Sequence, residues 1–234
     1  MKLKYKRVLI KLSGEALAGS KKTGVCYDTV LDICKKIKEV HDMGVQIGIV
    51  VGGGNFWRGR QNEEFDRVTA DYIGMLATTM NALTVNDAFC QLGVESRVAT
   101  AIEMRQIAEF YIKGRTYKHL DKNRIVIFGC GTGSPFFSTD TAAALKAAEI
   151  HADLLIKATN VDGVYDKDPN KYSDAKKYDE ISYLEVLNKK LCVMDSTSTT
   201  MCMDNEIPIL VVNINNEHDL KKAVEGKKIG TIVK

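Results

Sequence analysis

Short apolar runs that alternate with helical patterns are the feature that most constrains the fold of this chain. Each run has five to seven residues, mostly β-branched or aliphatic, and stays apolar through its length. Such runs predict strands that are buried on both faces, as in a parallel sheet covered by helices. The predicted strands are RVLIKL (7–12), VQIGIVV (45–51), SRVATA (96–101), RIVIFG (124–129), DLLIKAT (153–159), PILVVNI (208–214) and GTIVK (230–234).

Helical patterns occupy most of the segments between these runs. In residues 28–43 an apolar side chain recurs every three residues on one face, and Gly44 follows at the position that often ends a helix. Residues 66–92 form a longer segment rich in Ala and Met, closed by Gly93. Further helices are expected at 138–151, 195–205 and 217–225. The alternation predicts an α/β fold, a single domain over 1–234 with a mostly parallel central sheet and helices on both faces.

Composition limits what such a domain can do. The net charge of +3 and the 27% of charged residues give no support for a nucleic acid or a membrane as the main partner, so a cationic site must be local. The six cysteines contain no C-x-x-C pair, which argues against a disulfide scaffold, a zinc site and secretion. No stretch approaches the roughly 18 apolar residues of a membrane helix. A cytoplasmic enzyme or sensor is therefore expected.

The loops that follow four of the predicted strands are expected to bind a ligand, because ligands of parallel α/β sheets lie beyond the carboxyl ends of the strands. Three of the four are rich in glycine, hydroxyl groups and charge. Neither the Walker nor the dinucleotide-binding spacing is present, but glycine-rich backbone can still hold phosphate, and a predicted helix start follows the third loop. The loops are SGE (13–15), GGGNFWRG (52–59), GCGTGSPFFSTD (129–140) and ATNVDGVYDKDP (158–169).

Three basic residues lie near the same predicted strand ends. Lys11 is on the first strand, Arg58 follows the triple glycine and Lys157 is on the fifth. Each alone could simply extend to solvent. Three cations beside phosphate-type loops instead favour a site for anions, although Thr139 in the third loop has the alternative role of a helix cap.

Five segments carry a resemblance to a known family: KLSGEAL (11–17), GGGNFWRG (52–59), GTGSPFFSTDTAA (131–143), KATNVDGVYDKDP (157–169) and VMDSTSTTMCMDNEIP (193–208). Together they closely resemble the bacterial uridylate kinases, which belong to the amino acid kinase superfamily and not to the P-loop kinases. The resemblance runs from about Tyr5 to the C-terminus. It implies an amino acid kinase fold and the transfer of the γ-phosphoryl group of ATP to UMP, giving UDP and ADP in pyrimidine nucleotide biosynthesis.

The resemblance also assigns residues to each substrate. Around ATP it implies Lys11, Leu12, Ser13, Gly14 and Gly54 at the phosphates, Arg58 at the junction, and Thr159, Asn160, Tyr165 and Asp168 at adenine and ribose. Around UMP it implies Gly53, Arg58, Asp71, Thr132, Gly133, Phe137 and Thr139. Mg²⁺ is expected to be carried mainly by the ATP phosphates, with no protein residue assigned to the metal.

The expected mechanism follows from charge. Both substrates are anionic near neutral pH and the attacking UMP oxygen is already deprotonated, so cations matter more than a general base. Like charges about 4 Å apart repel by roughly 4 kcal/mol at an effective dielectric constant near 20, which one lysine could offset. Lys11 and Lys157 are the candidate catalytic cations, and Asp140 is interpreted as the residue that orients them. Asp195 is a further catalytic candidate, with helix capping as its alternative role.

Assembly and regulation are further implications of the resemblance. It implies a homohexamer built from dimers, with UTP and GTP as effectors. The segment GSKKTGVCYD (19–28) lies where family members carry a loop linked to GTP activation, and its two lysines depart from the commoner pattern, which argues against that activation here. In the long predicted helix, Met75, Leu76, Met80 and Leu83 are candidates for an interface or for the core.

Two other functions stay open. One is a related kinase that phosphorylates a carboxylate or a carbamate, which would not need Asp71 or the loop at 131–140. The other is a non-catalytic sensor of pyrimidine nucleotides, which would have no use for the cations Lys11 and Lys157.

Overall fold

The computed structural model describes residues 3–21, 23–58, 64–169, 171–191 and 193–234. Lys22, Gly59 and Cys192, which belong to patterns discussed above, lie outside them. The strands are β1 (Arg7–Leu12), β2 (Gln46–Val51), β3 (Ser96–Thr100), β4 (Glu109–Phe110), β5 (Ile125–Gly129), β6 (Leu154–Thr159), β7 (Val164–Tyr165), β8 (Lys177–Tyr178), β9 (Glu180–Ile181), β10 (Ile209–Asn213) and β11 (Thr231–Val233).

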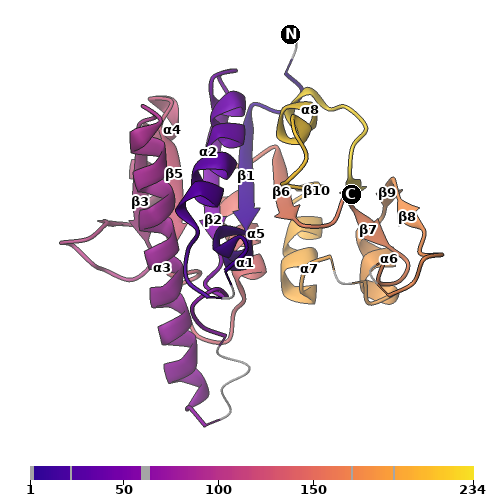
Figure 1. Cartoon of the computed structure of the whole chain (residues 1–234), viewed down its shortest axis with the longest axis horizontal. Helices are drawn as coiled ribbons and strands as arrows, with labels where there is room; N and C mark the ends of the chain where they lie inside the picture. Colours follow the sequence, from indigo (N-terminus) through magenta and orange to yellow (C-terminus); the bar gives the residue numbers. More distant parts are fainter. Residues whose placement is uncertain (1–2, 22, 59–63, 170, 192) are drawn as a thin grey trace.

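Within the described residues, nine of these strands form one sheet in the order β4-β3-β5-β2-β1-β6-β10-β11-β9, and β7 and β8 form a separate hairpin. Every neighbouring pair in the large sheet is parallel except β10 and β11. The mostly parallel sheet that the sequence predicts is therefore confirmed (Figure 1).

Helices cover both faces of the sheet. They are α1 (Gly14–Ala18), α2 (Tyr27–His41), α3 (Arg67–Gln91), α4 (Lys113–Asp121), α5 (Thr139–Glu149), α6 (Tyr183–Asn188), α7 (Ser196–Asp204) and α8 (Asp219–Glu225). One apolar core joins the sheet to α1, α2, α3 and α8, and a second joins its other face to α4, α5, α6 and α7. In the part of the chain that the structure describes, no helix is long and apolar enough to cross a membrane.

All five predicted helices are present, with ends within a few residues of those expected. The sequence did not predict α1, α4, α6 or the two-residue strands β4, β7, β8 and β9. These elements are short, and α4 buries only Thr116 and Leu120, so their apolar periodicity is weak. Helix α6 did carry a signal, because Ser182 and Glu185 form a capping box ahead of it.

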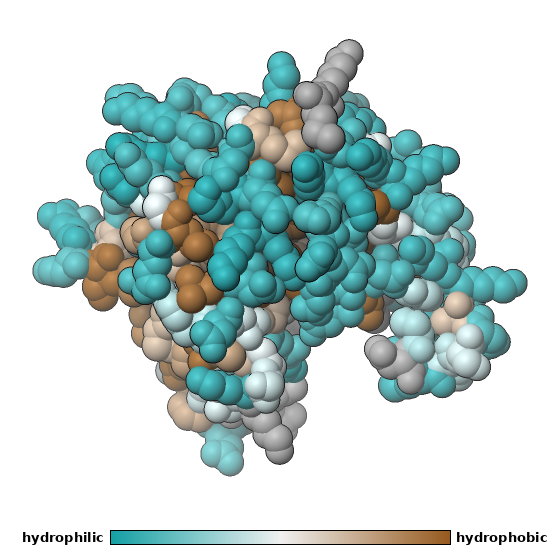
Figure 2. All heavy atoms as spheres, turned by 45° about the horizontal axis from the view of Figure 1, so that its top comes forward, coloured by the Kyte–Doolittle hydropathy of each residue, from teal (hydrophilic) through white to brown (hydrophobic). Residues whose placement is uncertain are grey.

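The molecule is hollowed at the end where the parallel strands finish. Helix α3 extends past the sheet at the lower left of Figure 1, and β7, β8 and α6 lie at the opposite side. Figure 2 shows the surface drawn in between these two projecting parts. The loops after β1, β2, β5 and β6 all lie at this end, which places the predicted ligand-binding segments together.

Candidate active site

Two lysines and one aspartate meet at the carboxyl ends of the central strands. Lys11 and Lys157 are direct partners in the parallel pairing of β1 and β6. Lys11 comes two residues after Leu9, and Lys157 comes two residues after Leu155. Both leucines pack in the core against α5, so strand alternation turns both lysines toward the start of that helix. Asp140 lies in the first turn of α5. Its Oδ1 is 3.0 Å from Nζ of Lys11 and its Oδ2 is 3.2 Å from Nζ of Lys157.

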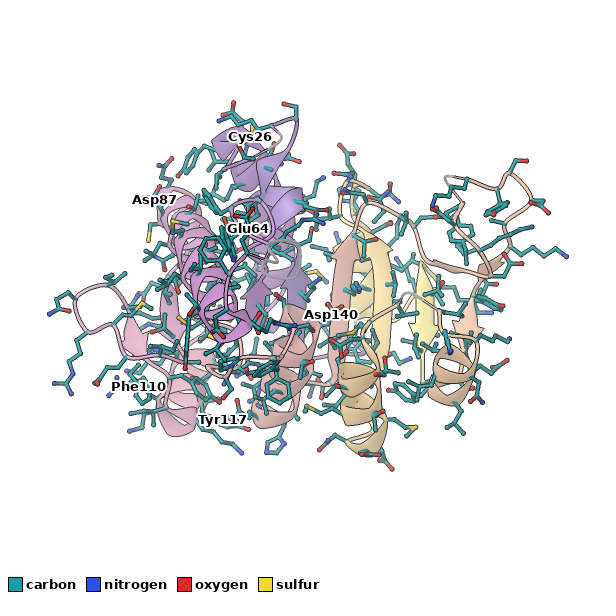
Figure 3. All side chains as sticks on the ribbon, turned by 90° about the horizontal axis from the view of Figure 1, so that it is seen from below. Cys26, Glu64, Asp87, Phe110, Tyr117 and Asp140 are labelled. Carbon is teal, nitrogen blue, oxygen red and sulfur yellow. The ribbon has the colours of Figure 1, made fainter. Side chains whose placement is uncertain are left out.

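The charges of this cluster are partly withdrawn from water, with side-chain exposures of 12% for Lys11, 17% for Asp140 and 15% for Lys157. Burial alone would raise the pKa of Asp140, but the two ammonium groups outweigh it and hold that pKa below its ordinary value. Burial lowers the pKa of Lys157, against the opposing effect of Asp140. Lys157 also donates a hydrogen bond to the carbonyl of Val193. The cluster keeps one excess positive charge at a fixed place (Figure 3, where Asp140 lies near the centre).

Asp195 joins the starts of α5 and α7. Its carboxylate caps α7 by accepting from the amide of Ser198 at 2.8 Å. It also accepts from the hydroxyl of Ser138 and, at 3.2 Å, from that of Thr141. The alternative role of Asp195 as a helix cap is therefore confirmed, and a catalytic role stays a prediction. Ser138, and not Thr139, caps α5.

Close packing explains two of the three glycines that follow β2. A Cβ on Gly52 would lie 3.1 Å from the amide nitrogen of Gly14. A Cβ on Gly53 would lie 2.9 Å from the Cβ of Ala77 and equally close to a backbone carbonyl of α3. A Cβ on Gly54 would meet only side-chain atoms, at 3.7 Å or more. The first two glycines thus let protein segments approach each other, whereas the third has no neighbour close enough to require glycine for packing.

A pocket of about 260 Å³ lies between the glycine turn, α3 and the loop that leads into α5. Five of the residues predicted to bind UMP line it: Gly53, Asp71, Thr132, Phe137 and Thr139. Gly54, predicted at the ATP phosphates, lines it as well. The other lining residues are Trp57, Gly131 and Ser138, which lie in the loops expected to bind a ligand, and five residues of α3 that the sequence did not assign to the site: Arg67, Ala70, Gly74, Met75 and Thr78. Several of these recur with Asp71 at helical spacing on α3, a signal that could have identified them.

Asp71 forms a fixed part of the pocket wall. Its Oδ2 accepts from Nε of Arg67 at 2.9 Å and from the amide of Phe136 at 2.7 Å. The guanidinium of Arg67 also lies over the ring of Phe136, 5.4 Å from its centroid. Asp71 is therefore not a solvated surface residue, because it ties α3 to the loop between Thr132 and Thr139.

Arg58 and Gly133 lie outside the residues that line the pocket. The Arg58 guanidinium forms an ion pair with Glu15 of α1. Gly133 has a φ of +81°, and a Cβ there would lie 3.1 Å from that of Ala101, so its turn and its packing both favour glycine. The UMP contacts assigned to these two residues stay predictions.

The residues predicted at the ATP phosphates follow β1 directly. The Ser13 hydroxyl caps α1 by accepting from the amide of Ala16 at 3.1 Å. Leu12 is fully buried in the core, so only its backbone is available to a nucleotide. Gly14 packs so closely on the glycine turn that a Cβ there would lie 2.8 Å from the Gly54 amide nitrogen.

The residues predicted at adenine and ribose lie after β6, and their polar groups form a local network. The Thr159 hydroxyl donates to the carbonyl of Val161 at 2.8 Å. The Tyr165 hydroxyl donates to Asp162 at 2.6 Å. The backbone carbonyl of Asn160 accepts from Asn213 at 3.2 Å, and Asp168 lies 3.8 Å from the ammonium of Lys171. These contacts shape the loop, and its binding of adenine stays a prediction.

Known proteins resemble this chain over nearly its full length. The sequence model of the amino acid kinase family matches residues 6–213. The crystal structure of a UMP kinase from Bacillus anthracis is similar at a TM-score of 0.95 and 37% identity, covering 98% of this chain and 96% of the other. A UMP kinase from Ureaplasma parvum gives 0.91 and 34%, covering 100% and 99%. A uridylate kinase from Archaeoglobus fulgidus gives 0.75 and 27%, covering 97% and 99%.

Proposed function

This chain belongs to the amino acid kinase family, and on that premise we propose that it is a UMP kinase, which transfers the γ-phosphoryl group of ATP to UMP and forms UDP and ADP. The observation that carries this function is the position of two lysines, bridged by Asp140, beside a glycine turn and a pocket that contains Asp71. A nucleotide acceptor accounts for the pocket, and phosphoryl transfer accounts for the lysines.

Bringing two anionic phosphates together is the main physical problem of this reaction. An oxygen of the UMP phosphate forms a bond to the γ-phosphorus while the bond from that phosphorus to the β–γ bridging oxygen breaks, which leaves ADP. We propose that Lys11 and Lys157 stabilise the negative charge on the transferring phosphoryl group. Asp140 keeps both ammonium groups in place through its two oxygens. Their positions are thus set before the substrates bind, which reduces the reorganisation needed in the transition state.

UMP is assigned to the pocket beside α3. Asp71 faces the ribose hydroxyls, and the segment from Thr132 to Thr139 surrounds the base and phosphate. The phosphate would draw Arg58 away from Glu15, since a guanidinium binds phosphate through two parallel hydrogen bonds. ATP is assigned to the other side of the glycine turn, with Ser13 and Gly14 at its phosphates and the loop after β6 at its adenine.

Mg²⁺ is assigned to the ATP phosphates. The carboxylate of Asp140 is engaged by two lysines and that of Asp195 by hydroxyl and amide donors. Among the described residues, no group of three or more His, Cys, Asp or Glu side chains is arranged to hold a metal ion. We therefore propose that the metal arrives with the nucleotide and lowers its charge.

A homohexamer built from dimers is the assembly that we propose from the family resemblance. Tyr72, Leu76 and Met80 support it, because they are 43%, 51% and 46% exposed and lie four residues apart along one side of α3. Met75, in contrast, is buried in this protein. Sedimentation velocity measures the assembly directly, and a monomer at micromolar concentration would contradict it.

An ADP-release assay with UMP, CMP, acetylglutamate and carbamate as acceptors tests the proposed activity. We expect turnover of UMP at a kcat/KM well above that of the other acceptors. Turnover of acetylglutamate or carbamate without UMP would identify the related kinase, and binding of UMP without any turnover would identify the sensor. Titration of UTP and GTP in the same assay tests the effectors that the family resemblance implies.

We propose the cytoplasm as the compartment of this protein, on the basis of the cysteine pattern.

A further inference from the structure

Two buried asparagines hold the glycine turn to α3. Asn55 directly follows the turn and Asn81 lies in the middle of α3, with exposures of 2% and 0%. The side-chain amide of Asn81 donates to Oδ1 of Asn55 at 2.7 Å, and that of Asn55 donates to Oδ1 of Asn81 at 3.0 Å. The two carboxamides therefore form a reciprocal pair inside the protein.

Each asparagine also donates a second hydrogen bond to backbone. Asn81 donates to the carbonyl of Gly52 at 2.7 Å, and Asn55 donates to the carbonyl of Gly24 at 2.7 Å. The amide of Gly24 in turn donates to the carbonyl of Asn55 at 2.9 Å. A side chain of this size with two donors and an acceptor is available only as asparagine, since aspartate has no donor and leucine has neither.

The pair lies at a junction of several chain segments. A Cβ on Gly14 would lie 2.4 Å from Oδ1 of Asn55, 2.8 Å from the amide nitrogen of Gly54 and 2.9 Å from the carbonyl of Gly52. The start of α1 therefore packs closely against one side of the turn, while α3 contacts the other side through the hydrogen bonds of Asn81. Asn55 follows Gly54 directly, and Asn81 binds the carbonyl of Gly52, so both side chains lie next to the backbone that carries the Gly54 amide.

We propose that Asn55 and Asn81 are positioning residues for phosphoryl transfer. They fix the backbone of Gly52, Gly53 and Gly54 relative to α3 and thereby direct the Gly54 amide at the transferring phosphate. This inference rests on the proposed function. Its physical basis is that a misplacement of about 1 Å at a reacting centre can lower a rate by about 10²-fold.

A purely structural role makes a different prediction. Loss of buried hydrogen bonds destabilises a protein wherever the bonds lie, so both roles predict a lower melting temperature. Only the positioning role predicts that folded variant protein has a lower kcat while its KM values for ATP and UMP change little, because the binding groups Asp71 and Thr159 lie elsewhere.

Steady-state kinetics of Asn81→Leu, Asn81→Asp and Asn55→Ala test the proposal, at a temperature well below the melting point of each variant. We expect a kcat lower by about 10- to 100-fold and KM values within about threefold of the wild type. Val85→Ala is the matched control, because Val85 is a fully buried residue of α3 that contacts the core instead of the turn. It should lower stability and leave kcat within about twofold.

The double variant Asn55→Ala/Asn81→Ala tests whether the two residues act as one unit. We expect its loss of kcat to be close to that of a single variant, because either change alone breaks the pair. Losses that multiply would contradict a pair, and a normal kcat in folded Asn81→Leu or Asn55→Ala would overturn the proposal. The wild-type rate with UMP tests the proposed function separately. If another acceptor is the true substrate, the same ratios are measured with that acceptor.

Discussion

The positions of Lys11 and Lys157 along their strands determine which face of the sheet their side chains point to. The tertiary structure determines which groups surround them. Strand alternation alone turns each toward the face of the sheet that α5 covers. Their separation from each other, and the presence of Asp140 between them, come from the pairing of β1 with β6 and from the place where α5 begins. A lysine at a strand end becomes a catalytic candidate only when such neighbours hold it away from solvent.

Replacement of Lys11 by alanine should lower kcat by about 100-fold or more, which corresponds to roughly 3 kcal/mol of transition-state stabilisation. The reason is that Lys11 is expected to stabilise charge on the transferring phosphoryl group, while UMP is held by other residues. Steady-state kinetics with each substrate varied in turn measure this. An unchanged kcat with a raised KM for ATP would show that Lys11 serves binding alone.

Replacement of Asp71 by asparagine should raise the KM for UMP about tenfold and leave the KM for ATP nearly unchanged. A carboxylate accepts both hydrogen bonds of a ribose diol, and each charge-assisted bond contributes about 1.5–3 kcal/mol. Because Asp71 also accepts from Arg67 and Phe136, the melting temperature of the variant must be measured beside its kinetics. A raised KM for ATP alone in Asp71→Asn would mean that the two sites are reversed.

Arg58→Lys should also raise the KM for UMP, since lysine cannot form the two-pronged contact with a phosphate.

In the glycine turn after β2, neighbouring glycines are required for different reasons, some for packing and some for a predicted ligand. A Cβ on Gly52 would meet the start of α1 and one on Gly53 would meet the backbone of α3, whereas Gly54 has no close neighbour. Gly53 and Gly54 both line the pocket. The sequence motif indicates that some group lies close to each glycine. It does not say whether that group belongs to the protein or to a ligand. Only the arrangement of α1 and α3 makes that distinction.

Gly53→Ala and Gly54→Ala should therefore differ in kind. The Gly53 variant places a methyl group 2.9 Å from Ala77 and from the α3 backbone, so we expect a melting temperature several degrees lower. The Gly54 variant meets only side-chain atoms at 3.7 Å or more, so its melting temperature should stay within about 2 °C while kcat/KM falls at least tenfold. Calorimetry and kinetics on both proteins measure this. Equal thermal stability of the two variants would contradict the assignment of Gly53 to packing.

For the whole molecule, the charge cluster links the stability of the sheet to pH. The pKa of Asp140 is held below its ordinary value of 3.8 by Lys11 and Lys157, against the effect of burial. The folded state therefore gains stability from the ionised Asp140 above about pH 4, and this gain is lost as the pH falls through the folded-state pKa.

Asp140→Asn should consequently be less stable than the wild type at pH 7, and the difference in unfolding free energy should shrink as the pH falls below about 4. Urea denaturation at a series of pH values measures the difference. Asp204→Asn, at the exposed end of α7, is the control and should track the wild type at each pH. A difference that stays constant down to pH 3 would show that the ion pairs with Lys11 and Lys157 do not stabilise the fold.

The sequence by itself determined the parallel sheet, the long helices and the loops that carry the chemistry, because burial on both faces requires continuous apolar runs and amphipathic helices show in their spacing. It also supplied the family resemblance and singled out six of the residues that line the pocket. The tertiary structure alone decided that Asp140 lies between Lys11 and Lys157, that Asp195 binds the hydroxyls at the start of α5, and that Asn81 reaches the glycine turn. These contacts join segments far apart in the chain, and local periodicity carries no information on which distant side chains will meet.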